Sequence, residues 1–285
     1  MDSDEGNRSE TWREAPTVNF RELCQCIEDL STRQKTAWRG QARPEWMLET
    51  TLDRCLHEIA SEGSYEQWLD HERKIVERFI AQAEPYASET EQKLLHGGIW
   101  KTLAFGRHAG LPTRLLDWTW SPWVAAWFAC HEHSDADGVI WWFDQRFLKE
   151  VLHPRWDEWG VPRWATVWNC ENRLDLINEL HLDQRVLEKT AFQPAGKTWV
   201  TKIHYGFPSS RMEAQQGFIT TCGRLRKTHN VAFDELPASD TISRGRIRIP
   251  AALKGEVLAS LREMNIHAKS LEYPGVDIVA RSIEP

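Results

Sequence analysis

The chain has 285 residues and a formal net charge of −7, with 41% hydrophobic and 27% charged residues. These fractions are those of a soluble globular protein, and the negative charge argues against a broad nonspecific nucleic-acid surface. No segment has the roughly 18 uninterrupted apolar residues that a membrane helix needs, and the acidic N-terminus lacks the apolar region of a secretory signal. We therefore expect a cytoplasmic protein without a membrane partner.

Two residue types constrain the interior further. The six cysteines are scattered and form no CxxC pair, so we expect reduced thiols and no disulfide framework. The sixteen tryptophans predict a Trp-rich core, because a buried indole fills a large volume. Some of them could instead stack on a planar ligand, and the candidates are Trp118, Trp120 and Trp123, which flank a polar segment.

Taken in chain order, the predicted elements begin with a disordered tail over 1–15 and a helix over 18–30, whose apolar residues recur at helical spacing. There follow a strand at 35–39, helices at 52–60, 66–83, 89–106 and 122–132, and a buried strand at 139–143. After an irregular insertion at about 145–197 come strands at 199–205, 217–222 and 246–250, a helix at 252–264, a strand-like segment at 266–271 and a C-terminal helix.

Helices dominate the first half of this pattern and strands the second. It predicts an α+β fold in which helices pack on a mixed, mostly antiparallel sheet. We expect one domain over 16–285, with the irregular stretch at 145–197 as an insertion and not a domain of its own.

The segment from His108 to Ala129 is the most informative part of the chain. Its first half is polar and punctuated by glycine and proline, which is typical of a loop with a short strand. Its second half is apolar and begins at Ser121 and Pro122, the residue types that favour the start of a helix. A polar loop at the mouth of a buried helix is a common place for a binding site.

Three segments could converge on such a site. Arg39, Gly40 and Gln41 lie at a strand end, residues 113–121 precede the buried helix, and residues 211–218 lead into a later strand. A guanidinium group binds phosphate or carboxylate with two hydrogen bonds. A neighbouring glycine lets a ligand approach the backbone, and a helix N-terminus adds donors.

With these motifs the chain resembles the FRG domain family. The element that names the family reads here as Trp38–Gln41, the long central signature covers residues 108–129, and a third element runs from Arg211 to Phe218. Residues 249–250 and 271–277 are similar to the usual end of the domain, so the resemblance extends from about 18 to 283.

The motif order of this family resembles that of ADP-ribosyltransferases, which implies NAD as the substrate. By this resemblance Arg39 contacts the NAD phosphate or ribose, and Gly40 allows close approach. Thr119 and Ser121 correspond to the hydroxyl element beside the nicotinamide. Gln216, or Gln215, occupies the usual glutamate position, where an amide cannot supply the charge that stabilises an oxocarbenium-like state.

Two carboxylates could replace the missing glutamate. Asp117 lies within the central signature, although it could also cap a turn or pair with Arg114, and Glu213 lies two or three residues from the expected position. His108 is either a capping imidazole or a proton-transfer group. The other side chains that we expect around the nucleotide are Gln41, Thr113, Arg114, Trp118 and Arg211.

Three hypotheses for function follow. The first is an NAD-binding, ADP-ribosyltransferase-like enzyme that passes ADP-ribose to a macromolecule or to water, in the manner of a bacterial toxin or anti-phage effector. The second is a catalytically inactive module that senses a nucleotide or a nucleic-acid end. The third is a nuclease-like or other hydrolytic effector that uses Asp117 and His108 and needs a metal or a nucleophile. We expect no metal site, because the cluster at residues 130–133 has no second ligand pair.

Overall fold

The computed structural model describes residues 12–31, 36–59, 62–144, 200–203, 210–235 and 244–271. The helices are α1 (Phe20–Ser31), α2 (Thr51–Ile59), α3 (Tyr65–Ala83), α4 (Glu89–Leu95), α5 (Ile99–His108), α6 (Pro122–Cys130), α9 (Ser210–Ala214), α10 (His229–Asp234), α11 (Lys254–Glu263) and α12 (Ala268–Leu271). The strands are β1 (Arg13–Pro16), β2 (Thr36–Gln41), β3 (Leu115–Thr119), β4 (Gly138–Asp144), β5 (Val200–Ile203), β6 (Gly217–Cys222) and β7 (Arg244–Ile249).

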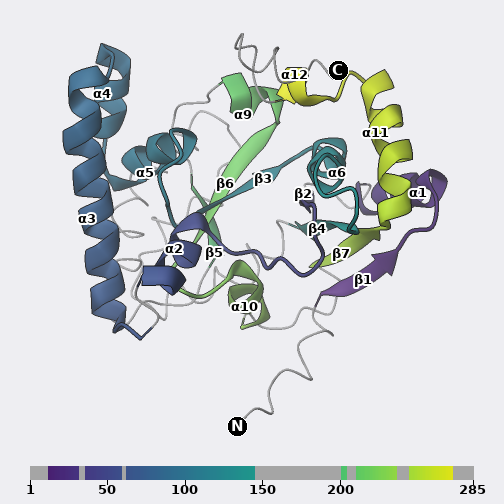
Figure 1. Ribbon diagram of the computed structural model, residues 1–285, viewed down its shortest axis with the longest axis horizontal. Helices are drawn as coiled ribbons and strands as arrows, with labels where there is room; N and C mark the ends of the chain where they lie inside the picture. Colours follow the sequence, from purple (N-terminus) through teal and green to yellow (C-terminus); the bar gives the residue numbers. More distant parts are fainter. Residues whose placement is uncertain are drawn as a thin grey trace, which may run out of the picture.

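The described strands form one seven-stranded sheet with the order β1-β7-β4-β2-β3-β6-β5. Neighbouring strands pair antiparallel, apart from the parallel pair of β1 and β7. The predicted α+β class with a mixed, mostly antiparallel sheet is therefore confirmed. Figure 1 shows α3, α4 and α5 on one side of the sheet's centre, and α1, α6 and α11 on the other.

Alternation along the strands divides the core into two layers, because successive strand side chains point to opposite faces. Trp38, Ile140 and Trp142 belong to the cluster that α1, α6 and α11 cover. Ala37, Trp141 and Phe143 belong to a second cluster on the other face, which α5 and α10 help to close. The predicted Trp-rich core is thus present in both layers.

Gly40 in the central strand β2 is where α6 packs most closely on the sheet. A Cβ atom built at Gly40 would lie 1.8 Å from the carbonyl oxygen of Ala125 and 2.7 Å from the amide nitrogen of Ala129. We had expected Gly40 to make room for a ligand. The structure shows instead that it makes room for the backbone of α6, whose small residues let the helix approach.

Lys254 ties the far end of α6 to the C-terminal part of the chain. Its ammonium group is buried and donates hydrogen bonds to the carbonyl oxygens of Ala42, Glu132 and His133 at 3.0, 3.0 and 2.8 Å. The three carbonyls satisfy all three donors of the ammonium, which is the condition for burying it.

Several predicted elements need correction. The helix expected at 89–106 is two helices, α4 and α5, because the chain turns at Gly98 with φ +100°. Part of the tail predicted over 1–15 forms β1, which pairs with β7. The strand expected at 266–271 is a turn followed by α12. The predicted insertion at 145–197 and the helix after residue 274 lie outside the described residues.

The helix α10 has no counterpart among the predicted elements, and it packs on one face of the sheet. Thr228 accepts a hydrogen bond from the amide of Val231 and so begins this helix. Across the described ranges, every helix is too short or too polar to span a bilayer.

We predict that Gly40→Ala lowers the free energy of unfolding by about 3 kcal/mol, because the added methyl group forces α6 off the sheet. Urea denaturation monitored by tryptophan fluorescence measures this change. Gly255→Ala on α11 is the matched control, since a Cβ there meets nothing within 4 Å, and it should change stability by less than about 1 kcal/mol. Equal stability of the two variants would contradict the packing argument.

Candidate functional site

The two central strands diverge at the point where the motif residues lie. Within the described strands, β2 and β3 share one paired position, Trp38 with Thr119. Beyond it the guanidinium of Arg39 bridges the strands, since its Nη1 donates a hydrogen bond to the carbonyl oxygen of Asp117 at 2.6 Å. Arg39 therefore replaces ladder hydrogen bonds that the diverging backbones do not make.

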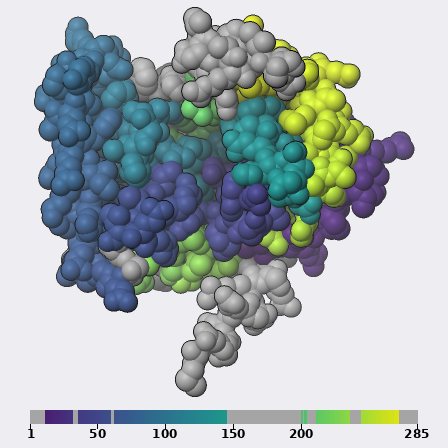
Figure 2. All heavy atoms as spheres, viewed as in Figure 1, coloured from purple at the N-terminus to yellow at the C-terminus, as the bar shows by residue number. Residues whose placement is uncertain are grey.

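The carboxylate of Asp117 reaches the surface beside this bridge. Its Oδ2 accepts hydrogen bonds from Nε and Nη2 of Arg107 at 3.2 and 2.6 Å, and its side chain is 46% exposed. The Nη1 of Arg107 donates to the hydroxyl of Thr51 at 3.1 Å, which joins the end of α5 to the start of α2. In Figure 1 β3 crosses between α5 and α6, and Figure 2 shows the surface hollowed between these helices.

A third guanidinium group, that of Arg54, lies close enough to Arg39 for its charge to act on it. Arg54 is exposed on α2, where its Nη1 donates to the carbonyl oxygen of Glu49 at 3.1 Å. The charges of Arg54 and Arg107 both act on Arg39. We call Arg39, Arg54, Arg107 and Asp117 the cationic notch, because it combines three guanidinium groups with one carboxylate.

The charge states of these groups follow from their surroundings. Burial lowers the pKa of Arg39 to about 10, so the group stays charged at neutral pH. Burial would raise the pKa of Asp117, but the charge and hydrogen bonds of Arg107 outweigh it and hold that pKa below its usual value. Burial lowers the pKa of His108 below 6.5, so its imidazole is neutral at pH 7 and could accept a proton.

The third motif segment meets the end of β3 through backbone contacts. The hydroxyl of Thr119 donates to the carbonyl oxygen of Gln215 at 2.6 Å, and the amide of Trp120 donates to that of Gln216 at 3.0 Å. Gln216 has φ +47° and closes the turn into β6 with its side chain exposed. Glu213 is exposed on α9. The structure thus brings the three segments together.

Arg211, also exposed on α9, lies within electrostatic reach of His108. This places the third segment beside the end of α5 as well as the end of β3. Among the described residues Arg211 forms no ion pair with an acid of its own segment. Its charge acts on the imidazole of His108, whose pKa it lowers.

Several residues that were predicted to contact the ligand form hydrogen bonds within the protein instead. Ser121 caps α6, and its amide donates to the hydroxyl of Thr119. Gln41 accepts a hydrogen bond from the indole of Trp141 and donates to the carbonyl oxygen of Met47. Thr113 is fully buried, and its backbone holds the start of α2. The side chains of Ser121, Thr119 and Gln41 and the backbone of Thr113 thus stabilise the scaffold, which their residue types alone do not reveal.

The structure contradicts the prediction that Trp118 stacks on a ligand. It is 3% exposed, lies edge-on to Phe143, and donates its indole N–H to Thr220 at 2.8 Å. Trp120 is half-buried and stacks on Phe218 with ring centroids 4.1 Å apart. Of these two tryptophans, Trp120 is the one with exposed surface beside the third motif segment.

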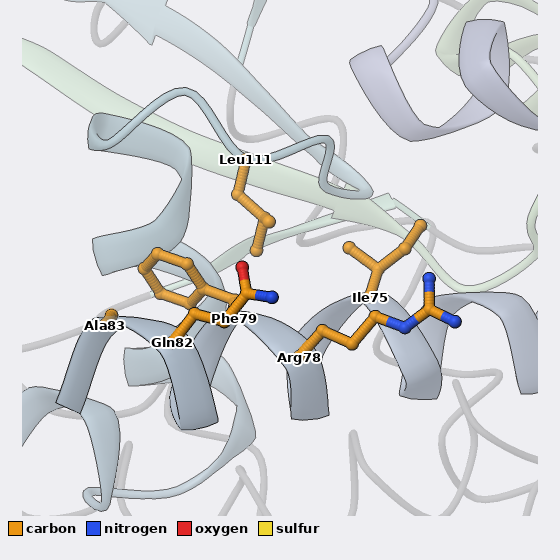
Figure 3. Close-up of a pocket in the computed structure, with 6 residues that line it drawn as sticks. All are labelled: Ile75, Arg78, Phe79, Gln82, Ala83 and Leu111. Carbon is orange, nitrogen blue, oxygen red and sulfur yellow. The ribbon is translucent and has the colours of Figure 1, made fainter. Parts of the chain in front are cut away.

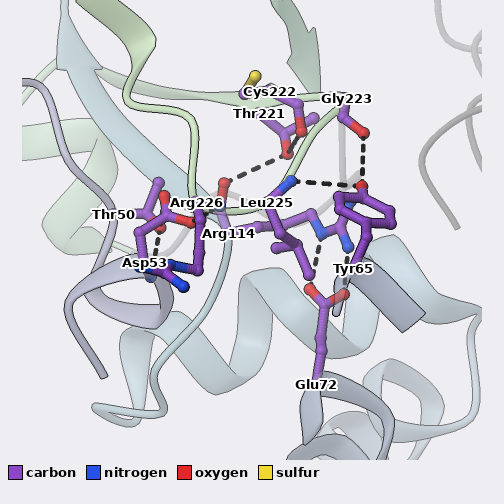
Figure 4. A network of polar contacts seen from close by, with 10 residues as sticks. All are labelled: Thr50, Asp53, Tyr65, Glu72, Arg114, Thr221, Cys222, Gly223, Leu225 and Arg226. Atoms are coloured by element: carbon purple, nitrogen blue, oxygen red, sulfur yellow. Dashed lines mark hydrogen bonds and ion pairs between the residues drawn. The ribbon is translucent and has the colours of Figure 1, made fainter. Parts of the chain in front are cut away.

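Arg114 does not pair with Asp117, as the sequence had suggested. It is buried and forms an ion pair with Glu72 of α3, in which its Nε lies 2.6 Å from the carboxylate. Figure 4 shows this pair in a polar network that also contains Asp53 and Tyr65. Asp117 pairs with Arg107 instead. Arg107 had no signal in the sequence, because a basic residue in the last turn of a helix is ordinary.

A second hollow lies away from the notch, between α3 and the loop after α5. Its volume is about 440 Å³, and Figure 3 shows its lining, which is formed by Ile75, Arg78, Phe79, Gln82, Ala83 and Leu111. Of these six residues Arg78 alone is charged, so the hollow has no pair of ionisable side chains that could act together in catalysis. In the described part of the chain, no group of three metal-ligating side chains comes together.

Comparison with known families identifies the segment that contains the notch. Residues 34–138 match the family model of the FRG domain. Over this segment the chain is similar to the FRG domain. All four residues of the cationic notch lie within the matched segment of this domain. No curated protein and no solved structure matches the chain.

We predict that Glu72→Gln destabilises the protein by about 3–5 kcal/mol, because it leaves the charge of Arg114 buried without its partner. Urea denaturation gives the loss. Glu89→Gln is the matched control, since it breaks an exposed pair with Lys93 and should cost less than about 1 kcal/mol. A loss in Glu72→Gln no larger than the control's would contradict a buried ion pair.

The buried imidazole of His229 makes the free energy of unfolding depend on pH. It is fully buried and hydrogen-bonded to Thr220, and burial, together with the charge of Arg39, lowers its pKa to about 3. The unfolded state therefore binds more protons between pH 6.5 and 3. Stability should be complete above pH 6.5 and fall as the pH drops, with a slope of up to about 1.4 kcal/mol per pH unit from this residue.

Denaturant titrations between pH 7.5 and 5 measure this slope. His229→Gln, whose amide can still bond to Thr220, should flatten it. His96→Gln on the exposed surface of α4 should leave it unchanged. Identical slopes for His229→Gln and the wild-type chain would show that His229 is not held neutral by burial.

Proposed function

We propose that this protein binds NAD, cleaves the bond between nicotinamide and ribose, and transfers ADP-ribose to a macromolecule or to water. The observation that supports this most is that the three motif segments meet along β3, where Arg39 bonds to the backbone of Asp117 and Thr119 bonds to that of Gln215. Charged guanidinium groups suit a pyrophosphate, and a nearby carboxylate suits a sugar that becomes cationic in the transition state.

The proposed roles use groups of the notch and of the adjoining motif that are not fully buried in the core. Arg39, Arg54 and Arg107 bind the anionic part of NAD. Asp117 supplies the negative charge that an amide at Gln216 cannot supply. Trp120 offers a ring surface for stacking. These assignments omit Trp118 and Arg114, which are buried in the scaffold.

The reaction balances without a further cofactor. The bond from ribose C1′ to the nicotinamide nitrogen breaks, and its electron pair neutralises the pyridinium ring. An acceptor oxygen, from a macromolecule or from water, bonds to C1′ and loses its proton. His108 is neutral at pH 7 and near Asp117, so it is our candidate to accept that proton.

A second function is favoured by the contacts of Asp117. Its carboxylate is held by Arg107, and the side chain of Gln216 carries no charge. A chain with these features could bind a nucleotide or a nucleic-acid end without turning it over. We propose the enzyme first, and further propose a bacterial cytoplasmic toxin or anti-phage effector as its biological role.

Incubation of the full chain with NAD labelled in the ADP-ribose part, with and without bacterial lysate, tests the proposal. We expect label transfer or nicotinamide release, reduced about 100-fold in Asp117→Asn because a transition-state charge is lost. Arg262→Ala, on the exposed face of α11, is the control and should retain full activity.

The outcomes separate the two functions. Absence of both label transfer and nicotinamide release would refute the enzyme. A rise in melting temperature with NAD or ADP-ribose in that case would favour the binding module. Turnover that persists in Asp117→Asn would remove Asp117 from the chemistry and point to Glu213.

A further inference from the structure

Asp117 makes the contacts that an anionic ligand would make in the cationic notch. Two N–H groups of Arg107 converge on one of its oxygens, at 3.2 and 2.6 Å, and the side chain remains 46% exposed. The pair therefore lies at the protein surface, where solutes can reach it. The pair is half-buried, with the Asp117 side chain more exposed than that of Arg107, so another anion can reach Arg107 from the solvent side and compete for it.

The notch holds more positive charge than Asp117 can neutralise. Arg39, Arg54 and Arg107 carry three charges against one carboxylate. Glu49, on the loop before α2, contacts His57 at 3.4 Å, and among the described residues it forms no ion pair with an arginine of the notch. Two uncompensated charges at one place are unusual in a chain whose net charge is −7.

The donors of the notch are also incompletely used. Arg39 donates through Nη1 to the carbonyl oxygen of Asp117, and among the described residues its Nε has no acceptor. Arg54, on the exposed face of α2, donates to the backbone carbonyl oxygen of Glu49. Neither guanidinium forms an ion pair within hydrogen-bond distance of a described carboxylate, so both can bind an anion without breaking one.

We propose that Asp117 is an internal counter-ion of the notch, and that a pyrophosphate group displaces it from Arg107. This inference deepens the proposed function, because it assigns the pyrophosphate subsite and links its occupation to the carboxylate. A displaced Asp117 no longer pairs with Arg107 and is free to face the sugar. Ligand binding would then prepare the carboxylate for its role.

The competition also selects the ligand class. Asp117 is attached to the chain, so its effective concentration at Arg107 is in the millimolar range or higher. A single carboxylate in solution has no advantage over it. A pyrophosphate carries several charges and presents many oxygens to guanidinium forks, so it can contact Arg39, Arg54 and Arg107 together.

Inorganic pyrophosphate is the probe for this inference, measured by isothermal titration calorimetry on the full chain. Asp117→Asn should bind it about tenfold more tightly than the wild-type chain, the ratio that one charge-assisted hydrogen bond supplies. Asp70→Asn removes the same charge from the exposed surface of α3 and is the matched control. Acetate should bind weakly to every variant.

A second set of variants tests the cations. Arg54→Ala and Arg107→Ala should each weaken pyrophosphate binding about tenfold, whereas Arg262→Ala should not. Arg107 also contacts Thr51, so its variant is checked by circular dichroism. Arg54 is exposed, which makes Arg54→Ala informative even if Arg107→Ala does not fold.

The inference is overturned if Asp117→Asn binds pyrophosphate no more tightly than Asp70→Asn, or if Arg54→Ala binds it as the wild-type chain does. Its failure is distinct from that of the proposed function, because pyrophosphate contains no bond to nicotinamide. Tighter binding by Asp117→Asn without any NAD turnover would support the counter-ion and refute the enzyme. NAD turnover with unchanged pyrophosphate binding would do the opposite.

Discussion

The hydrogen bond from Arg39 to the backbone of Asp117 is the contact around which the notch is arranged. The two central strands diverge there, and a diverging pair leaves carbonyl groups that need a donor. A guanidinium supplies that donor and at the same time places a permanent charge at the gap. One side chain thus completes the sheet and creates the electrostatic character of the notch.

Buried polar contacts behind the notch keep its walls in place. The buried pair of Arg114 and Glu72 joins the residue before β3 to α3, and the part-buried bond between Arg107 and Thr51 joins α5 to α2. Breaking such a pair leaves a charge without water or a partner, which costs far more than the pair contributes. The arrangement therefore favours a single geometry for the three arginines, although it adds little net stability.

Sequence patterns predicted the elements whose periodicity is strong and local. The helix expected at 66–83 corresponds to α3, and the apolar run at 139–143 lies within β4. The break at Gly98 escaped prediction because apolar spacing continues across it. The third motif was expected to meet the central signature, and it does so through backbone atoms of Gln215 and Gln216.

Individual side-chain roles were harder to predict, because partners far apart in the sequence decide them. Thr119 and Trp118 are adjacent, yet one bonds the third motif and the other lies in the core. The pairing of Asp117 with Arg107 depends on where α5 ends relative to β3. No local pattern encodes that position, whereas hydroxyls and arginines in a loop suggest a site in general terms.

The strand order around β2 determines what a shorter fragment of the chain would lose. A piece cut to residues 34–138 would keep β2 and β3 but lose β4 beyond Gly138, and with it β6 and β7. β2 would then lack its neighbour β4, and β3 would lack its neighbour β6. It would also lose the lysine whose ammonium closes the end of α6. Both borders of the shortened sheet would then offer bare backbone groups, an invitation to self-association. The recognisable motif is thus shorter than the unit that can fold.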